Sequence, residues 1–222
     1  MARLHLLRVF CDERGAGGNP LAVFLDGRQV PVSSRQEVAA DLGLSETVFV
    51  DDSARGELRI FTPTVELPFA GHPTVGTAWL LAAEGAPVAH LRVPAGELGV
   101  RYEDGATFVS ARPEWGPQFE WEQLDSPVAV EGLSGPPHGH DHIGAWAWLD
   151  EGAGSVRARV FALRYGIAED EATGAAAAIL CARLGRAIEI HQGRGSRIQA
   201  RPLDGGFVEV GGASALDEVR DY

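Results

Sequence analysis

Two short segments of this 222-residue chain have the residue types that bind an anion at the start of a helix. They are Gly71-His72-Pro73-Thr74 and Thr173-Gly174-Ala175, and each leads into a nearly uncharged stretch. The first N–H groups of a helix lack intrahelical partners, and the helix dipole places partial positive charge there. Glycine lets a ligand approach these amides closely. Two such helix starts facing one cleft would bind a carboxylate and stabilise an enolate-like anion. Ordinary helix N-caps explain the same pattern on local sequence alone.

Two acidic sites could take part in proton transfer. Glu46 lies in Leu44-Ser45-Glu46-Thr47, at the entry to an apolar strand. Burial there would raise its pKa toward the value that a general acid/base needs near neutral pH. A solvated glutamate at a strand edge is the alternative. Asp170, in Glu169-Asp170-Glu171, could accept a hydrogen bond from a substrate amine or hydroxyl, although acidic residues are also favoured at helix starts by the dipole alone.

The other potentially reactive side chains do not predict a functional site. The cluster His138-Gly139-His140-Asp141-His142 is one residue short of a binuclear zinc pattern, and its Gly- and Pro-rich surroundings predict a surface loop, so we expect no metal. We expect Cys181 to be a packed core thiol, and nothing marks Cys11 as reactive. All 19 basic residues are arginines, which excludes a Schiff-base lysine and the usual pyridoxal phosphate mechanism.

Composition limits the partners. A formal net charge of -12 argues against a nucleic-acid partner, which would need a basic face. Two cysteines cannot form a disulfide framework and fit a reducing compartment. The N-terminus lacks the long apolar run of a secretory signal, and no stretch is long enough to span a membrane. These features predict a soluble cytoplasmic protein without nucleic-acid or membrane partners.

The elements that must position these residues fall into two similar halves. The first half predicts strands near 4–10, 21–25, 47–50, 58–61, 90–93, 98–102 and 107–110, with a turn over 15–20. A helix is also predicted from Ser33 or Ser34 to Leu42. Ser34 and Glu37 match a capping box at its N-terminus, and Gly43 is suited to end the helix. A second helix over 74–84 is apolar on all sides, which predicts a buried helix.

The second half repeats this pattern after a stretch over 113–154 that is hard to interpret. We expect strands around Val128 and over 145–149, 157–164, 188–192, 197–201 and 207–210, and an apolar helix over 175–184. A helix without a polar face must be wrapped by a sheet. The simplest α/β (α+β) architecture is therefore two small lobes, each a curved mixed sheet wrapped around a central helix, with a linker near 112–125.

Four ordered motifs resemble the PhzF-like (phenazine biosynthesis) isomerases, within the diaminopimelate epimerase fold superfamily. They are GGNPLAVFLDG (17–27), LSETVFV (44–50), RIFTPTVELPFAGHPTVGTAWLL (59–81) and GIAEDEATGAAAA (166–178). The resemblance implies two pseudo-symmetric lobes: residues 1–115 with Glu46 and the first central helix, and a shortened lobe over 116–222 with Asp170 and the second. It also implies an active site in the cleft, a homodimer, and neither metal nor organic cofactor.

The resemblance also assigns roles. Glu46 corresponds to the catalytic acid/base of the family, and His72 and Asp170 correspond to polar residues that hold the substrate and assist proton transfer. Gly71 and Gly174 mark backbone donors. The remaining expected substrate-binding positions in these motifs are Asn19, Ser45, Pro73, Thr173 and Ala175.

The chain departs from the family at several points. The family usually has Pro where Glu171 stands and Ser where Ala175 stands, and its members are usually longer before Arg157. Neither helix-start loop has the cysteine that the superfamily's racemases use, which disfavours a two-thiol racemase.

The sequence therefore predicts a cofactor-independent isomerase of a small carboxylated metabolite, in secondary metabolism such as antibiotic biosynthesis. Glu46 would take a proton from one carbon and return it to another, which moves a double bond. Two alternatives stay open. One is an epimerase of a small acid that uses a carboxylate and a second base. The other is a degenerate family member that binds a metabolite or protein and catalyses nothing.

Overall fold

The computed structural model describes residues 2–222 as a mixed α/β fold that consists mostly of strands. The helices are α1 (Arg35–Leu42), α2 (Gly71–Ala83), α3 (Pro127–Glu131) and α4 (Gly174–Leu184). The strands are β1 (Arg3–Cys11), β2 (Gly17–Phe24), β3 (Thr47–Asp52), β4 (Glu57–Phe61), β5 (Glu66–Leu67), β6 (His90–Val93), β7 (Gly96–Glu103), β8 (Ala106–Ala111), β9 (Glu120–Gln123), β10 (Ile143–Asp150), β11 (Ser155–Ala162), β12 (Ile167–Asp170), β13 (Ile188–Gln192), β14 (Ser196–Pro202) and β15 (Val208–Asp221).

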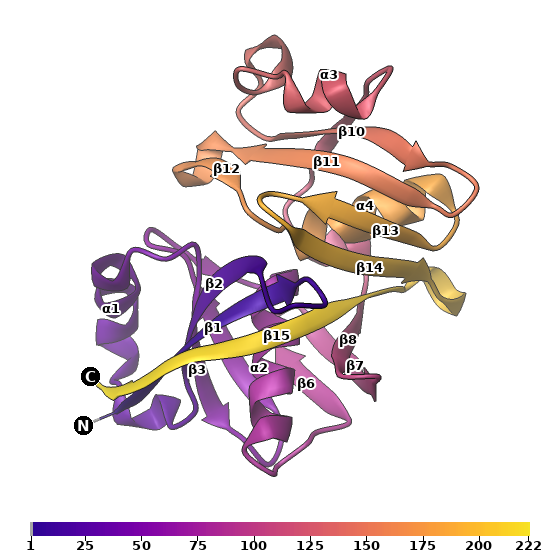
Figure 1. Ribbon diagram of the computed structural model, residues 1–222. Helices are drawn as coiled ribbons and strands as arrows, with labels where there is room; N and C mark the ends of the chain where they lie inside the picture. The colour runs from indigo at the N-terminus through magenta and orange to yellow at the C-terminus, as the bar shows by residue number, and fades with distance from the viewer. Residues whose placement is uncertain (1) are drawn as a thin grey trace.

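A closed ring of strands surrounds α2 (Figure 1). Its order is β1-β2-β3-β4-β6-β7-β8-β15, and β15 pairs back with β1. The enclosed helix is buried along nearly its whole length, as its uniform apolarity predicts. Gly76 lets α2 approach β1, because a Cβ there would lie 2.5 Å from a methyl group of Val9. The Thr77 hydroxyl is satisfied inside the core by donating to the Pro73 carbonyl at 2.7 Å.

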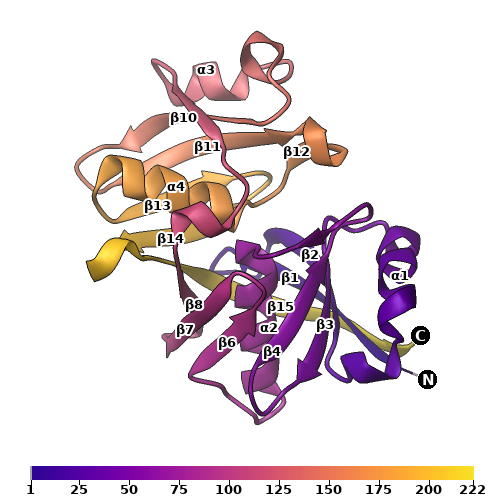
Figure 2. The same cartoon turned by 180° about the vertical axis from the view of Figure 1, so that it is seen from behind.

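A second group of strands continues from the ring and curves beside α4 (Figures 1 and 2). Its order after β15 is β14-β13-β11-β10-β9. Trp121 of β9 packs over this helix and donates a hydrogen bond from its indole N–H to the Ala176 carbonyl at 3.2 Å. One buried apolar cluster contains Leu80 of α2 and Leu180 of α4, so the two helices share a core.

The last strand joins the two groups of strands. Residues 208–211 of β15 lie between β8 and β14, and residues 213–221 pair with β1. The predicted strand over 207–210 was therefore too short. Its continuation, GGASALDEVRD, has small and charged residues without clear alternation, so the sequence pattern does not reveal it.

Other element predictions need correction as well. Residues around Val128 form α3 instead of a strand, because Pro127 starts the helix and the Ser126 side chain caps it. Strands β5, β9 and β12 were not predicted. Strand β2 begins inside the predicted turn over 15–20, where a Cβ on Gly17 would lie 2.8 Å from backbone atoms of Gly195. Helix α1 ends at Gly43 in the left-handed conformation as predicted, but Ser34 makes no side-chain cap.

Candidate active site

A pocket lies where the N-termini of α2 and α4 meet. Gly71 and Gly174 are the first residues of these helices, and a Cβ on Gly71 would lie 2.7 Å from the Gly174 Cα. The space between the lining residues, including the part open to solvent, is about 490 Å³.

Neither helix start has a side-chain cap. The residue before α2 is Ala70, which has no polar side chain, and Thr173, the residue before α4, makes no cap hydrogen bond. Its hydroxyl donates instead to Asp170 Oδ2 at 2.6 Å. The first backbone N–H groups of both helices are therefore left to a ligand with negative charge.

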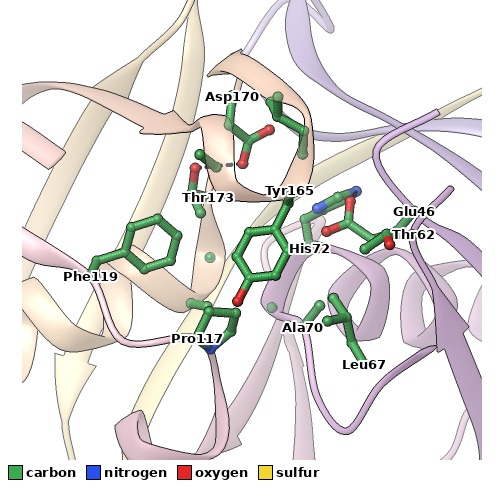
Figure 3. Close-up of a pocket in the computed structure, with 15 residues that line it drawn as sticks. Glu46, Thr62, Leu67, Ala70, His72, Pro117, Phe119, Tyr165, Asp170 and Thr173 are labelled. Carbon is green, nitrogen blue, oxygen red and sulfur yellow. Dashed lines mark hydrogen bonds and ion pairs between the residues drawn. The ribbon is translucent and has the colours of Figure 1, made fainter. Parts of the chain in front are cut away.

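Glu46 and His72 form a buried pair at one side of the pocket (Figure 3). Glu46 is placed by the start of β3 and His72 by the first turn of α2, and Glu46 Oε2 lies 3.5 Å from His72 Nε2. Neither of these two atoms has a hydrogen-bond partner within residues 2–222. Unsatisfied buried polar atoms are rare in folded proteins, and at a pocket they indicate a role with a ligand.

Burial changes the pKa values of both groups. Loss of solvent raises the pKa of Glu46 from its ordinary value of 4.5 to about 7, against a smaller opposing effect of the neighbouring Ser45 side chain. Loss of solvent lowers the pKa of His72 to about 4, although the Asp170 charge and the Pro20 carbonyl favour the protonated ring. Near neutral pH, His72 is therefore an uncharged acceptor, and Glu46 exchanges a proton with little cost.

Asp170 lies across the pocket from Glu46 and is held by a buried network. Its Oδ1 accepts from Asn19 Nδ2 at 2.7 Å, and its backbone carbonyl accepts from Gln192 Nε2 at 2.8 Å. The Ser45 hydroxyl donates to Asn19 Oδ1 at 3.4 Å, which links Glu46's neighbour to the network. Burial and the nearby Glu46 charge raise the pKa of Asp170 to about 6.

Most of the sequence-predicted site residues line this pocket: Glu46, Gly71, His72, Asp170, Thr173, Gly174 and Ala175. Three do not. Asn19 and Ser45 lie behind the lining residues, in the network that holds Asp170. Pro73 is buried in the first turn of α2, where its carbonyl accepts a hydrogen bond from the Thr77 hydroxyl.

Sequence reasoning missed the apolar wall of the pocket and one support residue. The wall includes Leu67, Pro117, Phe119, Ala162, Tyr165 and Ile167, and Thr62 also lines the pocket. Pro117 and Phe119 come from the stretch that matched no motif. Gln192 is the missed support, because it also donates to the Thr173 hydroxyl at 2.9 Å. Gln192 lies on the same face of β13 as the buried Ile188 and Ile190, and a glutamine on this apolar face was the available signal.

The histidine cluster does not converge on one point. His138 lies against Glu122, His140 against Glu120, and His142 contacts the Gln118 carbonyl. Within residues 2–222, no group of three or more His, Cys, Asp or Glu side chains is arranged to hold a metal ion. Cys181 is buried in α4, and burial raises its pKa to about 12, which fits an unreactive core thiol.

In the part of the chain that the structure describes, no helix has both the length and the apolar character to cross a membrane.

Two uncapped helix starts thus meet at a pocket beside a carboxyl–imidazole pair, and each of the two helices is covered by its own group of strands. This chain belongs to the PhzF family of isomerases: the family described as phenazine biosynthesis-like protein matches residues 7–132. The chain is 34% identical over 285 residues to trans-2,3-dihydro-3-hydroxyanthranilate isomerase of Pseudomonas aeruginosa, with 100% of both chains covered. The corresponding enzyme of Pseudomonas fluorescens is 33% identical, over 90% of this chain and 84% of the relative.

Solved structures show the same fold at low identity. The PhzF-family protein of Bacillus anthracis superposes with a TM-score of 0.82 at 18% identity, over 99% of this chain and 98% of that one. A hydroxyproline epimerase from Agrobacterium vitis superposes with a TM-score of 0.61 at 11% identity, over 99% and 91%. The chain thus shares the fold of the wider epimerase group.

Proposed function

We propose that this protein is a cofactor-independent isomerase that moves a proton and a double bond within a small carboxylated metabolite. The observation that carries the proposal is the Glu46 carboxyl. Its side chain is only 13% exposed, one of its oxygens has no hydrogen-bond partner within residues 2–222, and its pKa is raised to about 7 beside two uncapped helix N-termini.

The proton transfer needs no co-reactant. Glu46 as carboxylate takes a proton from a carbon of the substrate, and the electron pair of that C–H bond enters the conjugated system. Glu46 then returns the proton to a different carbon, so a double bond has moved and the atoms balance. The N–H groups at the starts of α2 and α4 hold the substrate carboxylate and stabilise the anion that develops.

We assign the other residues supporting roles. His72, uncharged, accepts a hydrogen bond at Nε2 from protonated Glu46 and so holds the proton in position between the two transfers. Asp170 orients a substrate hydroxyl or amine with its remaining lone pairs. Asn19 and Thr173 hold the Asp170 carboxylate in place by donating hydrogen bonds to its two oxygens. Ser45 supports Asn19 by donating a hydrogen bond to its side-chain oxygen.

The proposed substrate class is a cyclic acid like the one named for the Pseudomonas aeruginosa relative, a dihydro ring with hydroxyl, amino and carboxylate groups. The apolar wall that includes Leu67, Phe119 and Ile167 suits the faces of such a ring, and the polar end of the pocket suits its substituents.

The test uses trans-2,3-dihydro-3-hydroxyanthranilate in D₂O with the wild-type protein, Glu46→Gln and, as a control, Glu37→Gln on exposed α1. We expect the wild type and Glu37→Gln to isomerise the compound, with deuterium at the new C–H position seen by NMR. The rate of Glu46→Gln should be lower than that of the wild type by a factor of about 10²–10⁴, the usual contribution of general acid–base catalysis. Equal rates for all three proteins would remove Glu46 from the mechanism.

The same experiment separates the alternatives. Deuterium at an inverted stereocentre without movement of the double bond would identify an epimerase. No exchange with this compound or related cyclic acids, together with tight binding, would identify a non-catalytic binding protein.

We further propose that the molecule consists of two pseudo-symmetric lobes, residues 1–115 around α2 and residues 116–222 around α4. We also propose that it acts as a homodimer in the cytoplasm, in secondary metabolism. Light scattering coupled to size exclusion tests the dimer: a mass close to 23.6 kDa would show a monomer and a mass of twice that value a dimer.

A further inference from the structure

The polar side chains that line the pocket differ in whether they are already hydrogen-bonded. They are Glu46, Thr62, His72, Tyr165, Asp170 and Thr173. Thr62 donates to the Val65 carbonyl and accepts from its N–H, so its hydroxyl is occupied. Thr173 and Asp170 bond to each other and to the buried network described above. What stays free is the Glu46–His72 pair and the Tyr165 hydroxyl, which makes no hydrogen bond within residues 2–222.

The backbone fixes where Tyr165 projects. It ends a short 3₁₀ turn over Leu163–Tyr165, and Gly166 follows in the left-handed conformation with φ 79°. The Arg164 N–H donates to the Asp141 carbonyl at 3.1 Å, and the two side chains form an ion pair. This ties the turn to the residues just before β10. Figure 3 shows the Tyr165 ring across the pocket, with its hydroxyl directed toward the space between Pro117 and Ala70.

An aromatic stack supports this ring. His142 meets Tyr165 edge-on with 5.2 Å between ring centroids and lies 3.7 Å from the Phe119 ring. A His142 N–H donates to the Gln118 carbonyl at 2.8 Å, which fixes the imidazole in turn. Because packed aromatic rings lose little further freedom on binding, the tyrosine hydroxyl is held in place before a ligand arrives.

The space between Pro117 and Ala70, toward which the hydroxyl is directed in Figure 3, adjoins the two helix starts. Ala70 is the residue before α2, and Gly116, next to Pro117, approaches the first turn of α4 so closely that a Cβ on it would lie 3.0 Å from the Ala175 Cβ. The backbone N–H groups of this region attract an anion. A phenolic O–H beside them is a further donor, and hydrogen bonds to an ionised oxygen are about twice as strong as neutral ones.

We infer that Tyr165 is a specificity-determining residue whose hydroxyl donates a hydrogen bond to the substrate carboxylate at the helix N-termini. Its ring closes one side of the pocket over the bound acid. This inference deepens the proposed function and rests on it for the identity of the substrate. The binding of a carboxylate at this place does not depend on the proposed isomerisation. Proton transfer stays with Glu46.

The test measures binding of two fluorescent probes, 2-aminobenzoate and its uncharged analogue 2-aminobenzamide. The proteins are the wild type, Tyr165→Phe, which keeps the ring and its packing on His142, and Tyr222→Phe, a control at the exposed C-terminus. We expect Tyr165→Phe to raise the Kd for 2-aminobenzoate about tenfold, the effect of losing one charge-assisted hydrogen bond. The Kd for 2-aminobenzamide should change less than about threefold, as for a neutral hydrogen bond. Thermal melting should show all three proteins folded.

Three results would overturn the inference: equal effects on the two probes, no effect of Tyr165→Phe on either, or a wild type that does not prefer the carboxylate probe. These outcomes are independent of turnover. A carboxylate preference that depends on Tyr165 in a protein that isomerises nothing would instead contradict only the proposed isomerisation.

Discussion

Glu46 is placed where its charge is poorly solvated, and this has opposite consequences for chemistry and for stability. The raised pKa gives the carboxyl a proton affinity suited to proton transfer near neutral pH. It also means that the folded protein holds this proton more tightly than the unfolded chain does. Stability from this group is therefore complete below about pH 4.5 and is lost as the pH rises through about 7.

Glu46→Gln should consequently melt at a higher temperature than the wild type at pH 8, because the amide carries no charge to bury. At pH 4 the wild-type carboxyl is protonated, and the two melting temperatures should be nearly equal. Differential scanning calorimetry at both pH values measures this, with Glu37→Gln as the matched exposed variant. A difference that is the same at pH 4 and pH 8 would show that Glu46 is not perturbed by burial.

Glu171, where the resemblance leads us to expect proline, has a defined structural role. Its Oε1 accepts from the Arg194 N–H at 2.6 Å and from the Ser196 hydroxyl at 3.0 Å. The Ser196 oxygen in turn accepts from the Gly18 N–H at 2.9 Å, next to Asn19. The carboxylate thus joins the loop before α4 to β2, and it supports the Asn19–Asp170 contact from behind.

At the level of the elements, α2 and α4 form the anion-binding part of the site, because the first residues of the two helices are in contact. This contact requires glycine on both sides, since a Cβ on Gly174 would lie 2.9 Å from the Gly71 Cα. Side chains at these two positions would separate the helix starts and divide the anion site.

Gly174→Ala should therefore destabilise the protein by about 1–3 kcal/mol, the usual cost of overpacking. This is opposite in sign to the gain of about 1 kcal/mol that alanine gives inside an unconstrained helix. Carboxylate binding should weaken as well. Urea unfolding and 2-aminobenzoate titration measure the two effects. Gly135→Ala serves as control, because a Cβ there would meet nothing within 4 Å. A stabilised Gly174→Ala protein would show that the helix starts are not in contact.

Element prediction succeeded where a single pattern dominates. Helices α2 and α4 are uniformly apolar, and β3, β4 and β6 have buried β-branched or bulky residues, so local sequence defines them. Strand β9, with the sequence EWEQ, is held by Trp121 against α4 and by parallel pairing with β10. Both are long-range contacts, and a short charged segment carries no local sign of them.

At the scale of the whole molecule, β15 closes the ring around α2. Its residues 213–221 give β1 its second partner, and β1 carries buried Leu4, Leu7 and Val9. An unpaired β1 would expose a strand edge beside the core.

Removal of residues 213–222 should markedly lower the midpoint of urea unfolding and promote aggregation, although most of the deleted side chains are exposed or half-buried. Removal of residues 221–222 alone keeps most of the β1 pairing and should have a small effect. Unfolding curves and light scattering of both proteins measure this. Equal midpoints would show that the ring does not depend on closure by β15.

Short motifs, whose residue types have a direct chemical meaning, were enough to predict the family, the two buried helices and seven of the fifteen residues that line the pocket. Three features became visible only in the folded protein: Glu46 and His72 pair across 3.5 Å, Asn19 and Ser45 lie behind Asp170, and Tyr165 lines the pocket. The reason is physical: desolvation, helix-to-helix contact and the pairing of β15 with β1 join residues far apart in the chain, and no local pattern encodes such distances.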